Sequence, residues 1–84
     1  MTDLEDRILD ELYFVTSFEN LRSGVDLPED TLSEALWQLV NKGWVKCFTD
    51  PENEIQLEED YFRQHYRNYH YLASKQGLLA HNQR

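Results

Sequence analysis

The sequence has little of several residue types that would define a class of protein. Its 84 residues include one cysteine, two prolines and three glycines. A single cysteine, Cys47, excludes an internal disulfide and a thiolate metal site. It lies between Lys46 and Phe48 in a strand-like run, and we expect a buried structural thiol there.

Long apolar runs and a basic leader are missing as well. No apolar run approaches the ~20 residues that cross a bilayer, and the opening residues MTDLEDR are acidic where a secretory signal is basic and then apolar. The sequence therefore predicts a cytoplasmic protein with no membrane partner. A length of 84 residues with 40% hydrophobic and 29% charged residues predicts one globular domain, spanning 1–84.

Positive charge is scarce and unevenly placed. Residues 1–60 hold all 16 acids and only 4 bases, a net charge of −12, whereas residues 61–84 hold no acid and 4 bases, Arg63, Arg67, Lys75 and Arg84. Such a division can serve pairing within the chain, pairing between subunits or contact with a ligand.

Helical periodicity marks residues 1–43 as a three-helix core. Thr2 and Glu5 fit a capping box, in which each side chain accepts from the other residue's backbone amide. The first helix then shows a buried face at i, i+4 spacing, formed by Leu4, Ile8, Leu12 and Val15, with Asp6, Asp10 and Glu11 away from it.

A second, short helix is predicted to begin after an N-cap at Ser17. Phe18 and Leu21 point inward, and Gly24 is expected to end the helix in the left-handed conformation. Leu27 and Pro28 then make the turn into the third helix.

The third helix is expected from Pro28 to Gly43. Glu29 and Asp30 lie in its first turn, where the helix dipole favours negative charge. Its apolar face consists of Leu32, Ala35, Leu36, Leu39 and Val40. After Gly43, the run WVKCF changes the apolar period to two, which predicts a strand with Trp44 at its edge.

Two stretches resemble the winged helix-turn-helix domain, MarR-type transcriptional regulators among its members. The run FENLRSGVDLPEDTLSEALWQLVNKGWVKCF, residues 18–48, is similar to the helix-turn-helix core, and YLASKQGLL, residues 71–79, is similar to a Tyr-x-Leu-Thr-x-x-Gly stretch. Ser74 stands at the Thr position and Gly77 at the Gly, whereas Ala73 departs from the usual Leu. The resemblance implies an α+β, mostly α fold with a two-stranded wing within residues 44–73 and a C-terminal helix at 74–84.

Residues 49–73 allow two arrangements. Asp50, Pro51 and Asn53 are turn signals, so residues 44–49 could return through 55–57 as a tight hairpin and leave 58–81 as one long helix. The resemblance instead implies a longer wing, with a helical insertion at about 59–68, a return strand at 69–73 and a short helix capped by Ser74. We favour the second arrangement.

The outward face of the third helix is our candidate partner-binding site. Its residues would be Asp30, Ser33, Glu34, Trp37, Gln38 and Asn41, with Glu29 beside them. Three acids and no base are the wrong charge for a DNA groove lined with phosphates. Trp37 lies about 130° from the centre of the apolar face, counting ~100° per residue. It is therefore either exposed for a protein contact or covered by the first helix or the wing.

The stretch YFRQHYRNYHY, residues 61–71, is rich in aromatic and basic side chains. We expect its rings to fill the core. A subunit interface, in which Arg63 and Arg67 face the acidic helix of a partner, and contact with nucleic acid are the alternatives.

Residues suited to catalysis or metal binding are absent from the pattern. His65, His70 and His81 lack metal-ligand spacing, and no nucleophile motif or glycine-rich phosphate loop is present. We therefore expect no enzyme activity, no cofactor and no small-molecule ligand. The sequence predicts a non-enzymatic regulatory or adaptor module that binds a protein partner or a second copy of itself. The alternative is a DNA-binding regulator that brings Arg63, Arg67 and Lys75 to the phosphate backbone.

Overall fold

The computed structural model describes residues 2–82 as an α+β fold that is mostly helical. This part of the chain forms five α-helices, one short 3₁₀-helix, η1, and four strands. In chain order the elements are α1 (Asp3–Asp10), β1 (Thr16–Ser17), α2 (Phe18–Val25), α3 (Glu29–Lys42), β2 (Val45–Asp50), β3 (Asn53–Ile55), α4 (Glu59–His65), η1 (Tyr66–Asn68), β4 (His70–Ala73) and α5 (Lys75–Asn82).

The four strands form one antiparallel sheet in the order β1-β4-β2-β3. The central pair, β2 and β4, matches Val45 with Ala73 and Cys47 with Tyr71. These four side chains are buried, and they form the sheet's contribution to the main hydrophobic core. Strand β1 was not predicted, because two residues are too few to show a period of two.

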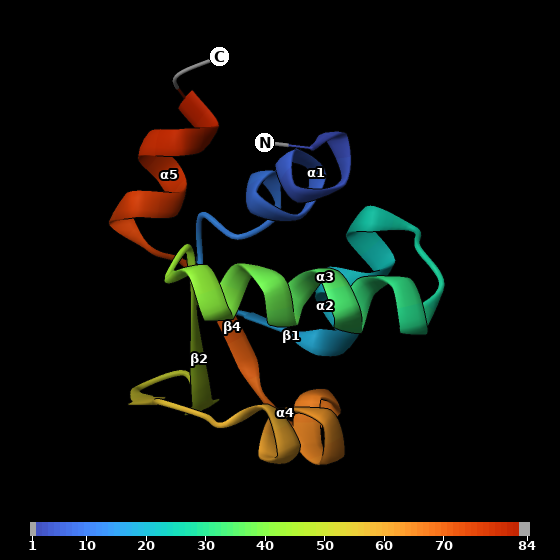
Figure 1. Ribbon diagram of the computed structural model, residues 1–84, viewed down its shortest axis with the longest axis vertical. Coiled ribbons are helices and arrows are strands. Elements are labelled where there is room, and N and C mark those ends of the chain that lie inside the picture. Colours follow the sequence, from blue (N-terminus) through green and yellow to red (C-terminus); the bar gives the residue numbers. More distant parts are fainter. Residues whose placement is uncertain (1, 83–84) are drawn as a thin grey trace.

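Helix α3 crosses the middle of the molecule, with α1 and α5 toward one end and α4 at the other (Figure 1). Leu32, Leu36 and Leu39 of α3 are fully buried. They pack in one cluster with α1, α2 and the sheet. The insertion between β3 and β4, residues 56–68, therefore lies on the opposite side of α3 from the packed pair α1 and α5.

Several local predictions are confirmed by the structure. The capping box of Thr2 and Glu5 is present, and Gly43 ends α3 with a left-handed φ of 80°. Ser74 caps α5, because its hydroxyl accepts from the backbone N–H of Gly77 at 3.1 Å. Residues 49–73 combine the two predicted arrangements: the helical insertion and the return strand of the longer one are present as α4, η1 and β4 in place of a single long helix, and the tight hairpin of the other is present as β2 and β3.

Two predicted helix ends are wrong. Helix α1 ends at Asp10, so Leu12 and Val15 lie beyond it; Leu12 is nevertheless buried, and its N–H bonds to the Leu9 carbonyl in a tight turn. Gly24 lies inside α2, and the left-handed residue that ends the helix is Asp26, with φ 52°. Asp shares with Gly some tolerance of this conformation because its short side chain bonds locally.

Gly77 is required by a close approach between α5 and the start of β2. A Cβ atom there would stand 2.2 Å from the carbonyl oxygen of Trp44. That carbonyl accepts from Ser74 N–H at 2.8 Å, while the Ser74 hydroxyl donates to the Gly43 carbonyl at 2.6 Å. The first turn of α5 is thus fastened to the residues between α3 and β2, with no room for a side chain at position 77.

We predict opposite effects for the same substitution at two glycines. Gly77→Ala should destabilise the fold by more than ~2 kcal/mol, because backbone atoms cannot move aside as a side chain can. Gly24→Ala should stabilise it by about 0.5–1 kcal/mol through helix propensity, since its Cβ would meet only the flexible end of the Glu11 side chain. Urea denaturation measures both, and a stable Gly77→Ala variant would contradict the assigned packing.

Candidate functional site

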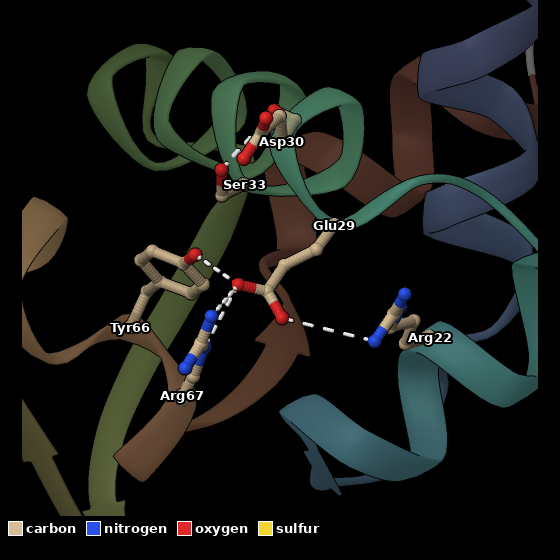
Figure 2. Close-up of polar contacts among 6 residues, drawn as sticks. All are labelled: Arg22, Glu29, Asp30, Ser33, Tyr66 and Arg67. Carbon is tan, nitrogen blue, oxygen red and sulfur yellow. Dashed lines mark hydrogen bonds and ion pairs between the residues drawn. The ribbon is translucent and has the colours of Figure 1, made fainter.

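The first turn of α3 presents the Glu29 carboxylate to three side chains of the same chain. The Tyr66 hydroxyl donates to Glu29 Oε2 at 2.6 Å, and Arg67 Nε donates to the same oxygen at 2.8 Å. Arg22 of α2 lies 3.7 Å from the other carboxylate oxygen. Figure 2 shows the carboxylate between the η1 side chains and Arg22. Glu29 therefore ties α2, α3 and the insertion together.

These contacts favour the charged form of Glu29. The Tyr66 hydroxyl bond, followed by the Arg67 bond, lowers the pKa of Glu29 below its ordinary value. The same carboxylate raises the pKa of Tyr66, because it accepts the phenolic proton in a hydrogen bond. At neutral pH the cluster thus holds an ionised carboxylate, a neutral phenol and two guanidinium groups.

A second carboxylate on α3 meets the insertion one turn further along. Arg63 of α4 donates to Glu34 at 2.9 Å and to Glu59, one turn earlier in α4, at 2.7 Å. The Arg63 hydrogen bond lowers the pKa of Glu34. Two alternatives from the sequence had Arg63 and Arg67 facing the acidic helix of a partner subunit or a nucleic acid; in the structure they face the acidic helix of their own chain.

Basic side chains are already engaged across most of the described part of the chain. Arg7 donates to the Val25 carbonyl, Lys42 pairs with Glu5, and Lys46 lies 3.7 Å from Glu54. With Arg22, Arg63 and Arg67, six of the seven Lys and Arg residues between positions 2 and 82 contact an acceptor of this chain. Lys75 is the exception, and it lies at the start of α5, outside the Glu29 cluster.

Trp37 is half-buried and belongs to the wall of a groove. Its ring packs on Phe62 of α4, with 5.5 Å between the ring centroids. Of the two alternatives, exposure or cover, the structure shows partial cover, and α4 of the insertion provides it. The hairpin groove is about 340 Å³ in volume. Its lining residues are Trp37, Val40 and Asn41 of α3, Val45, Lys46 and Cys47 of β2, Glu54 and Ile55 of β3, and Gly43, Gln56, Leu57 and Ser74.

A second hollow lies on the other side of α3's outer face. This groove, about 420 Å³ in volume, has Leu4 and Ala35 among its lining residues, with Glu34, Gln38 and Lys42 beside them. The six predicted partner-binding residues are therefore divided. Trp37 and Asn41 line the hairpin groove, Glu34 and Gln38 line the second hollow, and Asp30 and Ser33 lie in the first turns of α3, where the Ser33 hydroxyl donates to the Asp30 carbonyl at 3.1 Å (Figure 2).

Three residues at these sites were not predicted as site residues: Ile55 and Leu57 of the hairpin groove, and Tyr66 beside Glu29. Ile55 and Leu57 were assigned to a strand rather than to a groove wall, and Tyr66 was assigned to the core without a role for its hydroxyl. Alternation of apolar and polar residues in EIQL was the available signal. It did not reveal that the chain leaves the sheet after Ile55.

Between residues 2 and 82, no group of three or more His, Cys, Asp or Glu side chains is placed to hold a metal ion. Within the same range, no helix has both the length and the apolar character required to span a membrane. His81 is buried between α1 and α5, with Nδ1 2.5 Å from Asp6 and Nε2 3.4 Å from Asp10.

Comparison of the chain with protein-family models, with curated proteins and with solved structures gives no match in any of the three. Its function must therefore be argued from the arrangement of its own residues.

We predict that the Glu29 contacts stabilise the fold in a pH-dependent way. Because the folded-state pKa lies below the ordinary value of 4.5, the stabilisation is present above that pH and is lost as the pH falls through the lower, folded-state pKa. Glu29→Gln should therefore lower the melting temperature at pH 7, and this deficit should shrink as the pH falls. Glu19→Gln, on an exposed carboxylate of α2, is the matched control, and an equal deficit in both variants would contradict the cluster's role.

The Cys47 thiol is predicted to be inert in the folded protein. Only 2% of its surface is exposed, and burial raises its pKa to about 12. The thiolate is the reactive form, so iodoacetamide at pH 8 should label Cys47 at least a hundredfold faster in denaturant than in buffer. Mass spectrometry over time measures the ratio of the two labelling rates. Rapid labelling of the native protein would contradict the prediction and show that the thiol is accessible from the hairpin groove.

Proposed function

We propose that this chain is a winged helix-turn-helix module of the regulatory or adaptor kind. It is a cytoplasmic, non-enzymatic and transcription-related protein, and it acts through protein contacts on the outer face of α3. Support for the fold assignment comes from the order of elements. Helices α2 and α3 stand where the resemblance places the helix-turn-helix, the β2–β3 hairpin and β4 stand at its wing, and α5 stands at its last helix.

One observation supports this function: Arg22, Arg63 and Arg67 are already paired with carboxylates of the same chain. DNA binding draws most of its affinity from Lys and Arg groups that neutralise phosphates. Here Arg22 and Arg67 meet Glu29, and Arg63 meets Glu34 and Glu59. A phosphate would have to displace these carboxylates and approach a chain of net charge −8.

The outer face of α3 keeps residues suited to a protein contact. Asp30, Gln38 and Asn41 are exposed. The Asp30 carboxylate makes no ion pair within the described residues, and Gln38 donates to Glu34 of the same helix at 3.5 Å. Hollows with apolar walls lie on both sides of this row. A protein partner or a second copy of the chain could bury these walls against polar rims, as protein interfaces do.

The proposal predicts that the protein does not bind duplex DNA through its backbone. Fluorescence anisotropy of a labelled mixed-sequence duplex, titrated at ~50 mM and ~200 mM salt, should show no binding at either salt, because phosphate-driven affinity requires free bases. Micromolar binding at low salt that collapses at high salt would support the DNA-binding regulator instead. In that case Arg67→Ala should weaken binding and reduce the salt slope by roughly one.

If the protein acts through contacts on α3, a change of charge on the outer face of this helix should abolish its binding to partner proteins. Asp30→Lys and Asn41→Lys alter exposed side chains and should leave the melting temperature within a few degrees of the parent's. Trp37 is unsuitable for this test because it packs on Phe62. Proteins captured from extract by the parent chain should be lost with both variants and kept with Glu19→Lys on α2. Unchanged capture would exclude α3 as the contact.

A further inference from the structure

The hairpin groove arises from an early end to strand pairing. Strand β3 pairs with β2 only from Cys47 opposite Ile55 toward the turn, whereas β2 runs back to Val45. After Ile55 the chain leaves the sheet toward α4, so no strand of residues 2–82 pairs with Val45 and Lys46 on the β3 side. The space between this edge, the C-terminal half of α3 and Leu57 is the groove.

The groove offers apolar surface at several points. Trp37, Val40, Ile55 and Leu57 pack against the core from its rim and remain partly exposed. Beneath them, the Cys47 side chain is buried. A volume of about 340 Å³ lies at the lower end of the ~300–1,000 Å³ typical of ligand pockets. It is room for one large apolar side chain rather than for an extended ligand.

The segment that borders the groove carries an excess of negative charge, whereas the charged residues of the groove lining itself, Lys46 and Glu54, pair with each other. Residues 50–60 hold six acids, Asp50, Glu52, Glu54, Glu58, Glu59 and Asp60, and no Lys or Arg. Lys46 pairs with Glu54, and Arg63 pairs with Glu59. Glu52, Glu58 and Asp60 are exposed and make no side-chain ion pair with the described residues. A ligand in this groove therefore meets an apolar wall beside uncompensated carboxylates.

We propose that the hairpin groove binds a large apolar side chain of a Lys- and Arg-rich segment in a partner protein. The inference rests on the proposed function, because it specifies the chemistry of the partner that α3 would meet. Charge complementarity favours such a segment: its bases would face Glu58 and Asp60 while its apolar residue enters between Trp37 and Leu57. A second copy of the chain fits poorly, since its net charge is −8 and its Arg63 and Arg67 are already paired.

Trp37 provides a direct reporter of occupancy. In a Trp44→Phe background it is the one tryptophan, and its ring lines the groove. The probe is a synthetic lysine-rich peptide with one central phenylalanine, titrated into the full chain. We expect a saturable change in Trp37 emission and an affinity about tenfold lower at ~200 mM than at ~50 mM salt. A peptide with alanine in place of phenylalanine should bind at least tenfold more weakly.

Two variants separate the groove from general negative charge. Glu58→Lys should weaken the peptide at least fivefold, whereas Glu19→Lys, with the same change in net charge, should alter affinity less than twofold. Leu57→Ser should weaken binding of the phenylalanine peptide more than binding of the alanine peptide. Because Leu57→Ser could also disturb folding, the affinity of the Glu58→Lys variant decides whether the peptide binds at the groove. Equal binding of both peptides, equal effects of both lysine variants or an unchanged Trp37 signal would overturn the proposal.

Failure of the groove and failure of the proposed function give different results. If the peptide does not bind but Asp30→Lys and Asn41→Lys still abolish partner capture, the α3 contact stands and the groove is not its basic-segment site. If the peptide binds the groove and the parent chain also binds duplex in a salt-dependent way, the groove stands and the proposed function falls.

Discussion

The position of the insertion depends on the burial of Phe62. Its side chain is 1% exposed and packs against Trp37, Tyr66 and Tyr71, with ring centroids 5.5–6.3 Å apart. Fully burying such a side chain contributes about 1.5–3 kcal/mol, and exposed ion pairs contribute less than this. The ring therefore anchors α4 on the core, and the arginine contacts set how η1 and α4 align along α3.

Because Phe62 anchors the insertion and the arginine contacts align it, the acidic and basic parts of the chain meet within the molecule. Once Phe62 is buried, Arg63 and Arg67 lie on the side of the insertion that faces α3, where Glu34 and Glu29 stand. The Tyr66 hydroxyl adds a hydrogen bond from a partly buried ring. Arg63 and Arg67 therefore pair within the fold, and the acids near α3 that make no ion pair among the described residues include Asp30 and, in the segment 50–60, Glu52, Glu58 and Asp60.

The tight packing at the other end of α3 has a different basis. There, backbone groups rather than charges join the elements: Ser74 bonds to Gly43 and Trp44, and Gly77 lets α5 pass over the Trp44 carbonyl. One end of α3 is thus held by close backbone contact and the other by an aromatic anchor with ionic contacts. Between these two regions the groove stays open, because neither the backbone contacts nor the aromatic and ionic contacts extend to the edge of β2 at Val45 and Lys46.

Local chemistry was readable from the sequence alone. The capping box, the buried leucines of α3, Gly43 as its end, Ser74 as a cap and the buried Cys47 each follow from a residue and its near neighbours. Helix ends that depend on distant packing were not readable, which is why Val15 was placed in α1 and Gly24 at the end of α2. The partners of Arg63 and Arg67, the cover on Trp37 and the groove beside Leu57 join segments about 20–40 residues apart. Only the tertiary structure decides them, because periodicity tells which side of a helix is apolar but not which other segment comes to lie against it.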